Sequence, residues 1–515
     1  MGETMALIQL EYTHMLGIGA FLLCLAVLWQ LFLSPLKAFP GPFVAKFTDL
    51  WRAAAVLPGQ IDKVNRRWHQ KYGSAVRVGP NAIILNDPEM IKTVYSTKKA
   101  WVKSDMYMIN DVLINGKRLA NVFNTRDLAW HSQQIKPISK FFSMSRLMDI
   151  EPLLDVTINM LTSKLNEKFV DGPLKGKVCM MDDWLGWLAW DSMANVTFGR
   201  HYGFIEKEQD VDGLIEDSVN SMRYFAPVCQ IPWLDYLLDK NPIKRIGPKP
   251  QLTGTLYAVR AISEYKQEIA EKGLRSQNVP HLLDKYLGLD EQHPGMVNDA
   301  QLVNWLLPTV IAGGDTTASA MRAVVYFLAK NPETKNTLFL ELDQASLETP
   351  AQWKDLKELT YLDAVIREAM RVCPGIGLAP ERVVPEGGHI LPDGRFLPAG
   401  TRVGLNPAVT SRDPGVFGAE VDSFIPERWL KQDGEEETAF SQRFRRMHEV
   451  LDFVFGAGTR VCLGKNLAKL EIYKAITTLY SLYDINLVDP THEWKHYSSW
   501  FVYQLDIPTV ISRRD

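Results

Sequence analysis

The chain has 515 residues, of which 46% are hydrophobic and 23% are charged, a balance typical of a globular protein with a large core and unlike that of a disordered chain. Its 57 basic and 60 acidic residues give a net charge of -3 without a long basic stretch, which excludes nucleic acid as the expected partner. Five scattered cysteines favour a reducing compartment over a disulfide framework or a CxxC zinc site.

An uncharged stretch near the N-terminus runs from Tyr12 to Leu36. A helix of about 20 apolar residues is long enough to cross a bilayer, so residues 14–33 are predicted to span a membrane, with a buried core helix as the alternative. A cleaved secretory signal is disfavoured because acidic Glu3 and Glu11 precede the stretch. Basic residues follow the span and none precedes it, so the positive-inside rule places the rest of the chain in the cytoplasm.

The expected anchor covers residues 1–37, and a catalytic part, residues 38–515, follows the proline-rich turn AFPGPF, which ends helix. From about 60 to 370 the apolar periodicity is mostly helical. Between about 380 and 405, short β-type runs flank an Asp-Gly turn and predict a small sheet. The expected fold class is therefore mainly α with small β-sheets.

One cysteine, Cys462, lies in the unusual segment FGAGTRVCLG, and an apolar stripe with helical spacing follows it directly. Unpaired amides and the positive dipole end at a helix start favour a thiolate, and Arg460 adds a permanent cation. Glycines suit positive φ or the close approach of a flat molecule to the backbone. The alternative is a buried free cysteine in a glycine-rich turn. The glycines concerned are Gly456, Gly458 and Gly464.

The segment matches the pattern F-x-x-G-x-R-x-C-x-G, and with it the sequence resembles the cytochrome P-450 family of haem-thiolate monooxygenases. The matching residues are Phe455, Gly458, Arg460, Cys462 and Gly464. The resemblance implies that Cys462 is the axial ligand of the iron in haem b. It also implies that Phe455 lies against the cysteine side of the haem and that Arg460 faces a propionate. The fold it implies is a single large helical domain after a transmembrane helix.

A second segment of the family pattern is AGGDTT at 312–317, in a stretch whose apolar residues fall on all sides as in a buried helix. Glycines in a helix interior cost about 1 kcal/mol each relative to alanine, and an uncompensated buried aspartate costs more. The resemblance implies that Gly313 and Gly314 open room for dioxygen. It assigns the protons that O–O cleavage consumes to Asp315 and Thr316. The alternative is a threonine bonded to the carbonyl four residues back and an aspartate paired with a distant cation.

Three charged residues match a buried structural triad of the family: Glu368 and Arg371 in EAMR, and Arg428 in FIPERW. Alone, the Glu-Arg pair is equally explained as a surface ion pair. Arg382 matches a position from which family members reach a haem propionate, with a strand-end surface arginine as the alternative.

The segment WHSQQIKPISKFFS departs from the family pattern, in which a Trp or His precedes an Arg by four residues. His131 occupies the first position, but the second falls on Ile135, and Pro137 disturbs the helix. His131 is the candidate for propionate contact from this segment, with Lys136 as the other possibility.

The substrate cavity that the resemblance implies is lined by mostly apolar side chains, which suit a lipophilic small molecule bound through buried area. Each of these residues is equally compatible with an ordinary core position. The candidates are Met106, Met108, Phe225, Ile376 and Phe501.

The resemblance extends from residue 39 to the end of the chain and implies a microsomal enzyme in the endoplasmic reticulum membrane, single-pass, with a cytoplasmic catalytic domain. Without a flavin or nicotinamide fingerprint, electrons must come from NADPH through a partner reductase. RVGPNAI and SRDPGVFGAEVDSFIPERWL are most similar to ascomycete secondary-metabolism members related to pisatin demethylase. Two alternatives stay open: a haem-thiolate isomerase or dehydratase without external reductant, against which Asp315 and Thr316 argue, and a non-enzymatic haem-binding membrane protein.

Overall fold

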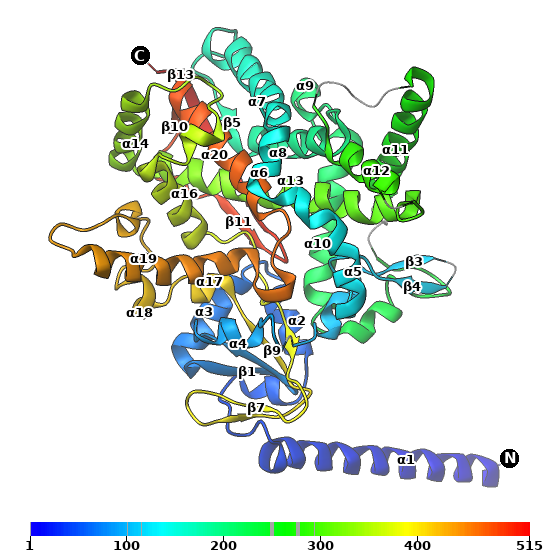
Figure 1. Ribbon diagram of the computed structural model, residues 1–515. Helices are drawn as coiled ribbons and strands as arrows, with labels where there is room; N and C mark the ends of the chain where they lie inside the picture. The colour runs from blue at the N-terminus through cyan, green and yellow to red at the C-terminus, as the bar shows by residue number, and fades with distance from the viewer. Residues whose placement is uncertain are drawn as a thin grey trace.

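Helices form most of the molecule, and two small sheets lie toward its opposite ends (Figure 1). The computed structural model describes residues 2–99, 101–114, 116–247, 252–273, 279–292 and 294–514. The mainly α fold with small sheets that the sequence predicts is confirmed.

The helices of the first half of the chain start with α1, the extended helix at the N-terminus in Figure 1. They are α1 (Gly2–Leu28), α2 (Leu50–Val56), α3 (Ile61–Tyr72), α4 (Met90–Val94), α5 (Leu128–Ser139), α6 (Met144–Leu147), α7 (Glu151–Leu165), α8 (Met181–Phe198), α9 (Phe204–Lys207) and α10 (Leu214–Val228).

The helices of the second half include α13, the long central helix. They are α11 (Leu252–Lys272), α12 (Leu282–Gln292), α13 (Asp299–Lys330), α14 (Pro332–Ala345), α15 (Trp353–Leu356), α16 (Thr360–Val372), α17 (Pro407–Thr410), α18 (Pro414–Phe417), α19 (Glu437–Leu451) and α20 (Lys465–Leu482).

The strands pair into one four-stranded sheet of order β1-β2-β9-β6, one three-stranded sheet of order β10-β13-β5 and three two-stranded ribbons, β11-β12, β3-β4 and β7-β8. They are β1 (Ala75–Gly79), β2 (Ala82–Leu85), β3 (Val112–Ile114), β4 (Lys117–Leu119), β5 (Cys179–Met180), β6 (Arg382–Val383), β7 (His389–Ile390), β8 (Phe396–Leu397), β9 (Arg402–Leu405), β10 (Tyr483–Leu487), β11 (Lys495–Ser498), β12 (Val502–Leu505) and β13 (Pro508–Arg513).

The core is built around α13, which packs against α8, α11, α16 and α20. The side chain of Asn298 caps α13 by accepting a hydrogen bond from the backbone N–H of Gln301 at 2.9 Å. α8 is buried along almost its whole length, as its apolar residues on all sides require. Because α8 and α20 both contact α13, side chains that are far apart in the sequence meet along the central helix.

The predicted small sheet near residues 380–405 is confirmed in the β7-β8 ribbon, where Gly394 takes a φ of +83° in the turn. The expectation of helix from about 60 to 370 is wrong at β1 and β2, which form an antiparallel pair. Both strands are fully buried, so their residues read as short apolar runs that periodicity does not distinguish from buried helix.

The predicted membrane span coincides with an apolar helical segment, His14–Leu33, which the rest of the described protein leaves uncovered. Its last turn, Trp29–Leu33, is a π-helix. The guanidinium of Arg77 in β1 donates to the side-chain oxygen of Gln30 at 2.5 Å and to the carbonyl oxygen of Pro80 at 2.8 Å. These bonds attach the base of the helix to the four-stranded sheet.

Candidate functional site

The glycine-rich loop that precedes α20 is closed by backbone bonds. The N–H of Cys462 donates to the carbonyl oxygen of Phe455 at 2.7 Å. Gly456 and Gly458 have φ values of +73° and +65°, which other residues adopt only with strain. A Cβ at Gly458 would lie 1.8 Å from the carbonyl oxygen of Tyr95, so glycine is also required there for close packing.

Gly464, unlike Gly456 and Gly458, has no positive φ. It is the N-cap of α20 and has a φ of -80°, so its backbone conformation is open to any residue. A Cβ there would lie 3.9 Å from Sγ of Cys462 and would meet nothing else within 4 Å. The missing side chain at Gly464 therefore leaves open space beside the sulfur.

The Cys462 thiol is exposed, yet burial raises the pKa of this thiol above its ordinary value. Both observations hold when the sulfur faces a hollow inside the protein. The backbone amides of Gly464 and Lys465 and the Lys465 charge lower the pKa, but burial outweighs them. The expectation that the protein alone favours the thiolate is therefore wrong, because the helix starts three residues later, at Lys465. A coordinated metal ion would remove this proton.

The hollow has a second wall on α13. Most of the helix between Gly314 and Ala329 is buried, but Ala312 is exposed and Thr316 is partly exposed in the middle of the molecule. The hydroxyl of Thr316 donates to the carbonyl oxygen of Ala312 at 2.7 Å, the local bond that the alternative interpretation expects. Because α13 packs against α20, we infer that these exposed surfaces face the same hollow as Cys462.

The Asp315 carboxyl is buried and has three hydrogen-bond donors. Its oxygens accept hydrogen bonds from the Trp190 indole at 3.2 Å, the Ser218 hydroxyl at 2.7 Å and the Tyr503 hydroxyl at 3.0 Å. Burial raises the pKa of Asp315, and these three bonds and the Arg322 charge lower it less. The sequence did not mark Trp190, Ser218 or Tyr503, since they come from three separate elements.

The expectation that Gly313 and Gly314 open room for dioxygen is wrong. A Cβ at Gly313 would lie 2.7 Å from Sδ of Met193, and one at Gly314 would lie 2.8 Å from the ring of Trp190. Both partners belong to α8. The glycines are therefore needed because α8 and α13 pack closely, and this packing offsets their cost in a helix.

Four basic side chains gather beside the loop: His131, Arg382, Arg460 and Lys103. Arg382 and Lys103 are partners in an isolated β-bridge, and the positive charges of both act on neighbours in the cluster. Burial, then the charges of Arg460 and Lys103, lower the pKa of His131 to about 4. Burial and the charge of Arg382 lower the pKa of Arg460 to about 10.

No carboxylate forms a salt bridge with this basic cluster within the described parts of the chain. Nε and Nη1 of Arg460 are buried without a hydrogen-bond partner, and Nη2 only reaches the carbonyl oxygen of Asp127 at 3.4 Å. Arg382 donates to the carbonyl oxygen of Glu381 at 2.9 Å and to the Tyr107 hydroxyl at 3.4 Å. The cluster therefore lacks a carboxylate partner among the described residues, which suits the binding of an anionic group.

Lys103 belongs to this cluster but was not predicted. It is 5% exposed, and burial, followed by the charges of Arg382 and Arg460, holds the pKa of its amine well below the ordinary value. The ammonium donates to the carbonyl oxygen of Phe123 and lies 4.2 Å from the Tyr107 ring centroid. No local motif marks Lys103, because its role depends on the pairing with Arg382. Lys136, by contrast, is exposed on α5.

Glu368, Arg371 and Arg428 are brought together in the interior. Arg371 donates to both carboxylate oxygens of Glu368 at 2.8 Å, and Nε of Arg428 donates to one of them at 2.8 Å. The Trp429 indole and the Ile425 N–H also donate to the Glu368 carboxylate, at 2.9 Å each. Burial raises the pKa of Glu368, but the bonds and charges of the arginines outweigh it, so the net shift is downward.

Four of the five predicted pocket residues lie in one apolar cluster around Trp500. Met106, Phe225 and Phe501 are buried in it, Ile376 packs against it, and Met108 is not part of it. Ile376 and Phe501 form an isolated β-bridge. The Trp500 ring contacts those of Tyr107 at 5.7 Å, Phe123 at 5.5 Å and, from α10, Phe225 at 5.6 Å.

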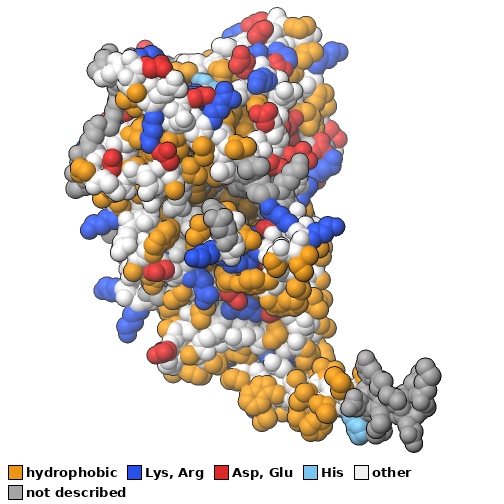
Figure 2. Space-filling view, turned by 90° about the vertical axis from the view of Figure 1, so that its right-hand side faces the viewer, with side chains coloured by type: hydrophobic (Ala, Val, Ile, Leu, Met, Phe, Trp, Pro, Cys, Tyr) orange, Lys and Arg blue, Asp and Glu red, His pale blue; other side chains and the backbone are white. Residues whose placement is uncertain are grey.

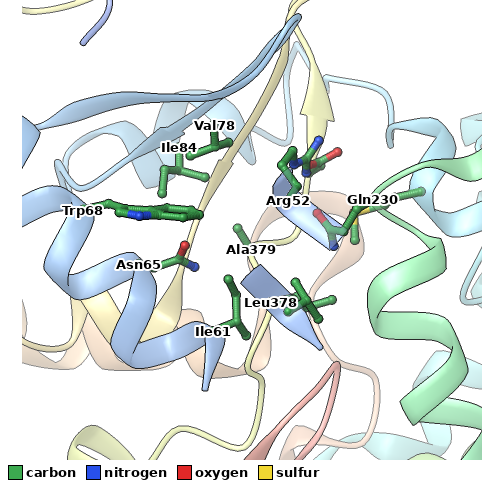
Figure 3. A pocket seen from close by; sticks show the side chains of 12 residues that line it. Arg52, Ile61, Asn65, Trp68, Val78, Ile84, Gln230, Leu378 and Ala379 are labelled. Carbon is green, nitrogen blue, oxygen red and sulfur yellow. The ribbon is translucent and has the colours of Figure 1, made fainter. Parts of the chain in front are cut away.

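A small cavity lies between this cluster and the four-stranded sheet (Figure 3). Its volume is about 30 Å³, which is room for about two water molecules and far too little for an organic substrate. Neither Cys462 nor Thr316 lines it. The lining includes Trp68, Arg52, Gln230, Leu378 and Ala379, which surround the space in Figure 3.

The loop and the basic cluster fit haem. An exposed cysteine sulfur that faces a hollow inside the protein, open space beside it at Gly464 and unpartnered donors on Arg460 suit an iron porphyrin with two carboxylates. Cys462 would hold the iron, and Arg460, Arg382, His131 and Lys103 would hold the propionates.

Comparisons with known proteins agree with this geometry. The family model described as Cytochrome P450 matches residues 40–509. "Cytochrome P450 monooxygenase cfoH" of Aspergillus candidus is 35% identical over 518 residues, covering 100% of this chain and 96% of that protein. "Cytochrome P450 monooxygenase cicH" of Emericella nidulans is 35% identical over 91% of this chain and 92% of its own length. "Cytochrome P450 monooxygenase mfmA" of Annulohypoxylon moriforme is 34% identical over 93% and 92%.

Proposed function

The chain belongs to the cytochrome P450 family and is a haem-thiolate monooxygenase, and on this premise we propose that it inserts one oxygen atom of O2 into a lipophilic small molecule of secondary metabolism. The observation that carries the proposal is the apolar cluster of Met106, Phe225 and Phe501, which offers burial of area and few polar anchors. Fungal monooxygenases among the relatives support the metabolic assignment.

Haem, when bound, supplies the iron at which dioxygen is reduced and split. Cys462 would hold that iron through its sulfur and would donate electron density to it. The Thr316 hydroxyl, partly exposed on α13, would hold a proton for this chemistry, and Asp315, the next residue, would be the reserve from which that proton is replaced. The bond from Thr316 to the Ala312 carbonyl fixes the orientation of the hydroxyl.

Electrons reach the site from NADPH through a partner reductase. The sequence has no G-x-G-x-x-G fingerprint for a flavin or nicotinamide, so the chain does not bind the donor itself. This requirement also separates a monooxygenase from an isomerase or dehydratase, which turns over without a reductant.

We assign the protein to the endoplasmic reticulum membrane, with residues 1–37 as a single-pass anchor and residues 38–515 as one cytoplasmic catalytic domain. The exposed apolar segment His14–Leu33 supports the anchor. Hydrophobic side chains also gather at the end of the molecule that carries this helix (Figure 2). Phe43 and Leu50, just beyond the anchor, are 64% and 62% exposed, as expected of residues beside a lipid surface.

The test uses the full-length holoenzyme in phospholipid vesicles with a fungal cytochrome P450 reductase. Lipophilic extracts are screened for a ligand-induced change in the haem spectrum, and hits are incubated with NADPH under 18O2. A product that carries one 18O atom and forms only with reductase and NADPH is expected. A product that forms equally without either contradicts the proposal and favours isomerisation or dehydration.

A further inference from the structure

Asp315 is held by two hydroxyl groups that come from two elements at the wall of the predicted pocket. Ser218 lies on α10 and is 2% exposed, and Tyr503 lies on β12 and is 3% exposed. Both hydroxyls donate to the same carboxylate oxygen, at 2.7 Å and 3.0 Å. The other oxygen accepts from the Trp190 indole at 3.2 Å. A buried carboxylate with three donors is held in one orientation.

All three donors are neutral groups. Their hydrogen bonds are therefore the main interactions that stabilise the charged form of Asp315. Among the described residues, no cation forms a hydrogen bond or salt bridge with the Asp315 carboxylate, which is bonded by Trp190, Ser218 and Tyr503. The Arg322 charge lowers the pKa of Asp315 from about two helical turns further along α13, and Nε of Arg322 donates to the Asp182 carbonyl oxygen at 2.8 Å. Arg322 also interacts with the charges of Asp182 and Asp183, so its positive charge is not available to Asp315 alone.

We propose that Ser218 and Tyr503 are positioning residues that hold the Asp315 carboxyl ready for proton supply to Thr316. The inference rests on the proposed function, because it names residues that act through Asp315 in that reaction. Burial favours the protonated form, and each hydroxyl bond favours the anion. The two hydroxyls therefore keep Asp315 able to exchange its proton, where burial alone would keep it protonated.

The same two elements carry the pocket wall. Phe225 lies two turns after Ser218 on α10, and Phe501 precedes Tyr503 by two residues in the ribbon. Phe225 and Tyr503 belong to one apolar cluster with Trp500. A ligand that contacts this wall therefore contacts the elements that carry Ser218 and Tyr503. Ligand binding in the pocket is thus linked to proton supply through these two hydroxyls.

The test compares S218A and Y503F with matched controls in the ferric holoenzyme. S221A removes a hydroxyl from the same helix that donates only to the Asp217 carbonyl oxygen at 2.8 Å. Y497F removes a hydroxyl from the residue that pairs with Tyr503 in the β11-β12 ribbon. Infrared spectra of protein labelled with [4-13C]aspartate are titrated with pH, and D315N identifies the Asp315 band by its loss.

S218A and Y503F are each expected to raise the midpoint of the Asp315 band by about one pH unit, while S221A and Y497F leave it unchanged. The peroxide released per NADPH oxidised is expected to rise several-fold in the same two variants. An unchanged midpoint in both, or a band that is present at every pH in the wild type, overturns the proposal. A shifted midpoint with unchanged peroxide release overturns the link to proton supply. The infrared result stands even if no NADPH-dependent oxygenation is found, so the two proposals fail separately.

Discussion

The N–H of Cys462 donates to the carbonyl oxygen of Phe455 at 2.7 Å, which closes the glycine-rich loop by backbone bonds alone. The loop conformation is therefore set by the protein before any cofactor binds. Because the loop is pre-organised, a substitution that distorts its backbone is expected to weaken cofactor binding directly.

Replacing Gly458 by alanine is expected to abolish haem retention. The new Cβ would lie 1.8 Å from the Tyr95 carbonyl oxygen, at a φ of +65° that alanine adopts with strain. G394A is the matched comparison, because Gly394 has a similar φ of +83° but lies in the β7-β8 turn, where a Cβ would meet nothing within 4 Å. The ratio of haem to protein after purification measures the effect. Equal haem content in G458A and the wild type would contradict this account of the loop.

Replacing Lys103 by methionine is expected to act in opposite directions on the two forms of the protein. In the cofactor-free form the change removes a buried amine whose charged form is disfavoured by burial and by Arg382 and Arg460, so the thermal midpoint rises. In the holoenzyme the change removes a propionate contact, so haem dissociates about ten- to a hundredfold faster. Thermal unfolding and haem transfer to apomyoglobin measure the two effects.

K140M is the control for this experiment, since Lys140 is exposed on the surface next to Phe141. K140M is expected to leave the thermal midpoint of the cofactor-free form and the rate of haem dissociation unchanged. A K103M protein with a lower midpoint in the cofactor-free form and unaltered haem dissociation shows that Lys103 is an ordinary core residue.

Replacing Glu368 by glutamine is expected to destabilise the fold by about 3–5 kcal/mol. The change leaves two arginines in the interior without their shared carboxylate, and Glu368 and Arg371 are both 0% exposed. E437Q, which breaks the exposed pair with Lys431, is expected to cost under about 1 kcal/mol. Denaturant unfolding measures the loss of unfolding free energy in both variants. Equal losses would show that the triad contributes no more than a surface ion pair.

His496 is expected to make stability depend on pH above neutrality. Burial lowers the pKa of its imidazole, but the hydrogen bonds with Asp62 and Cys373 outweigh burial and raise the pKa to about 10. A folded pKa above the unfolded value of 6.5 gives stability that is complete below pH 6.5 and is lost as pH rises toward 10. Between pH 6.5 and 9.5 the wild type should lose about 3–4 kcal/mol more than H496Q. Parallel pH dependences in the two proteins would exclude this role.

The sequence predicted those features whose residues are close together in the chain. The helix of α13, the β7-β8 turn and the apolar N-terminal helix each follow from local periodicity or turn chemistry. The cysteine loop was predictable because its glycines, arginine and cysteine form one motif.

What the sequence missed depends on contacts between distant segments. Lys103 joins the basic cluster through a β-bridge with Arg382, and the donors to Asp315 come from α8, α10 and β12. The role of Gly313 was misread for the same reason, since its partner Met193 lies on another helix. Burial likewise outweighed the helix-terminal amides at Cys462, and depth in the fold is not visible in a local pattern.

The central claim is that the sulfur of Cys462 binds the haem iron, and the absorption spectrum of the reduced holoenzyme under carbon monoxide tests it most directly. The wild type and C24S, whose cysteine lies in the apolar N-terminal helix α1, should show the strongly red-shifted Soret band of a thiolate-ligated haem. C462S should lose that band. A wild-type spectrum typical of imidazole ligation, or a red-shifted band that persists in C462S, would contradict the claim.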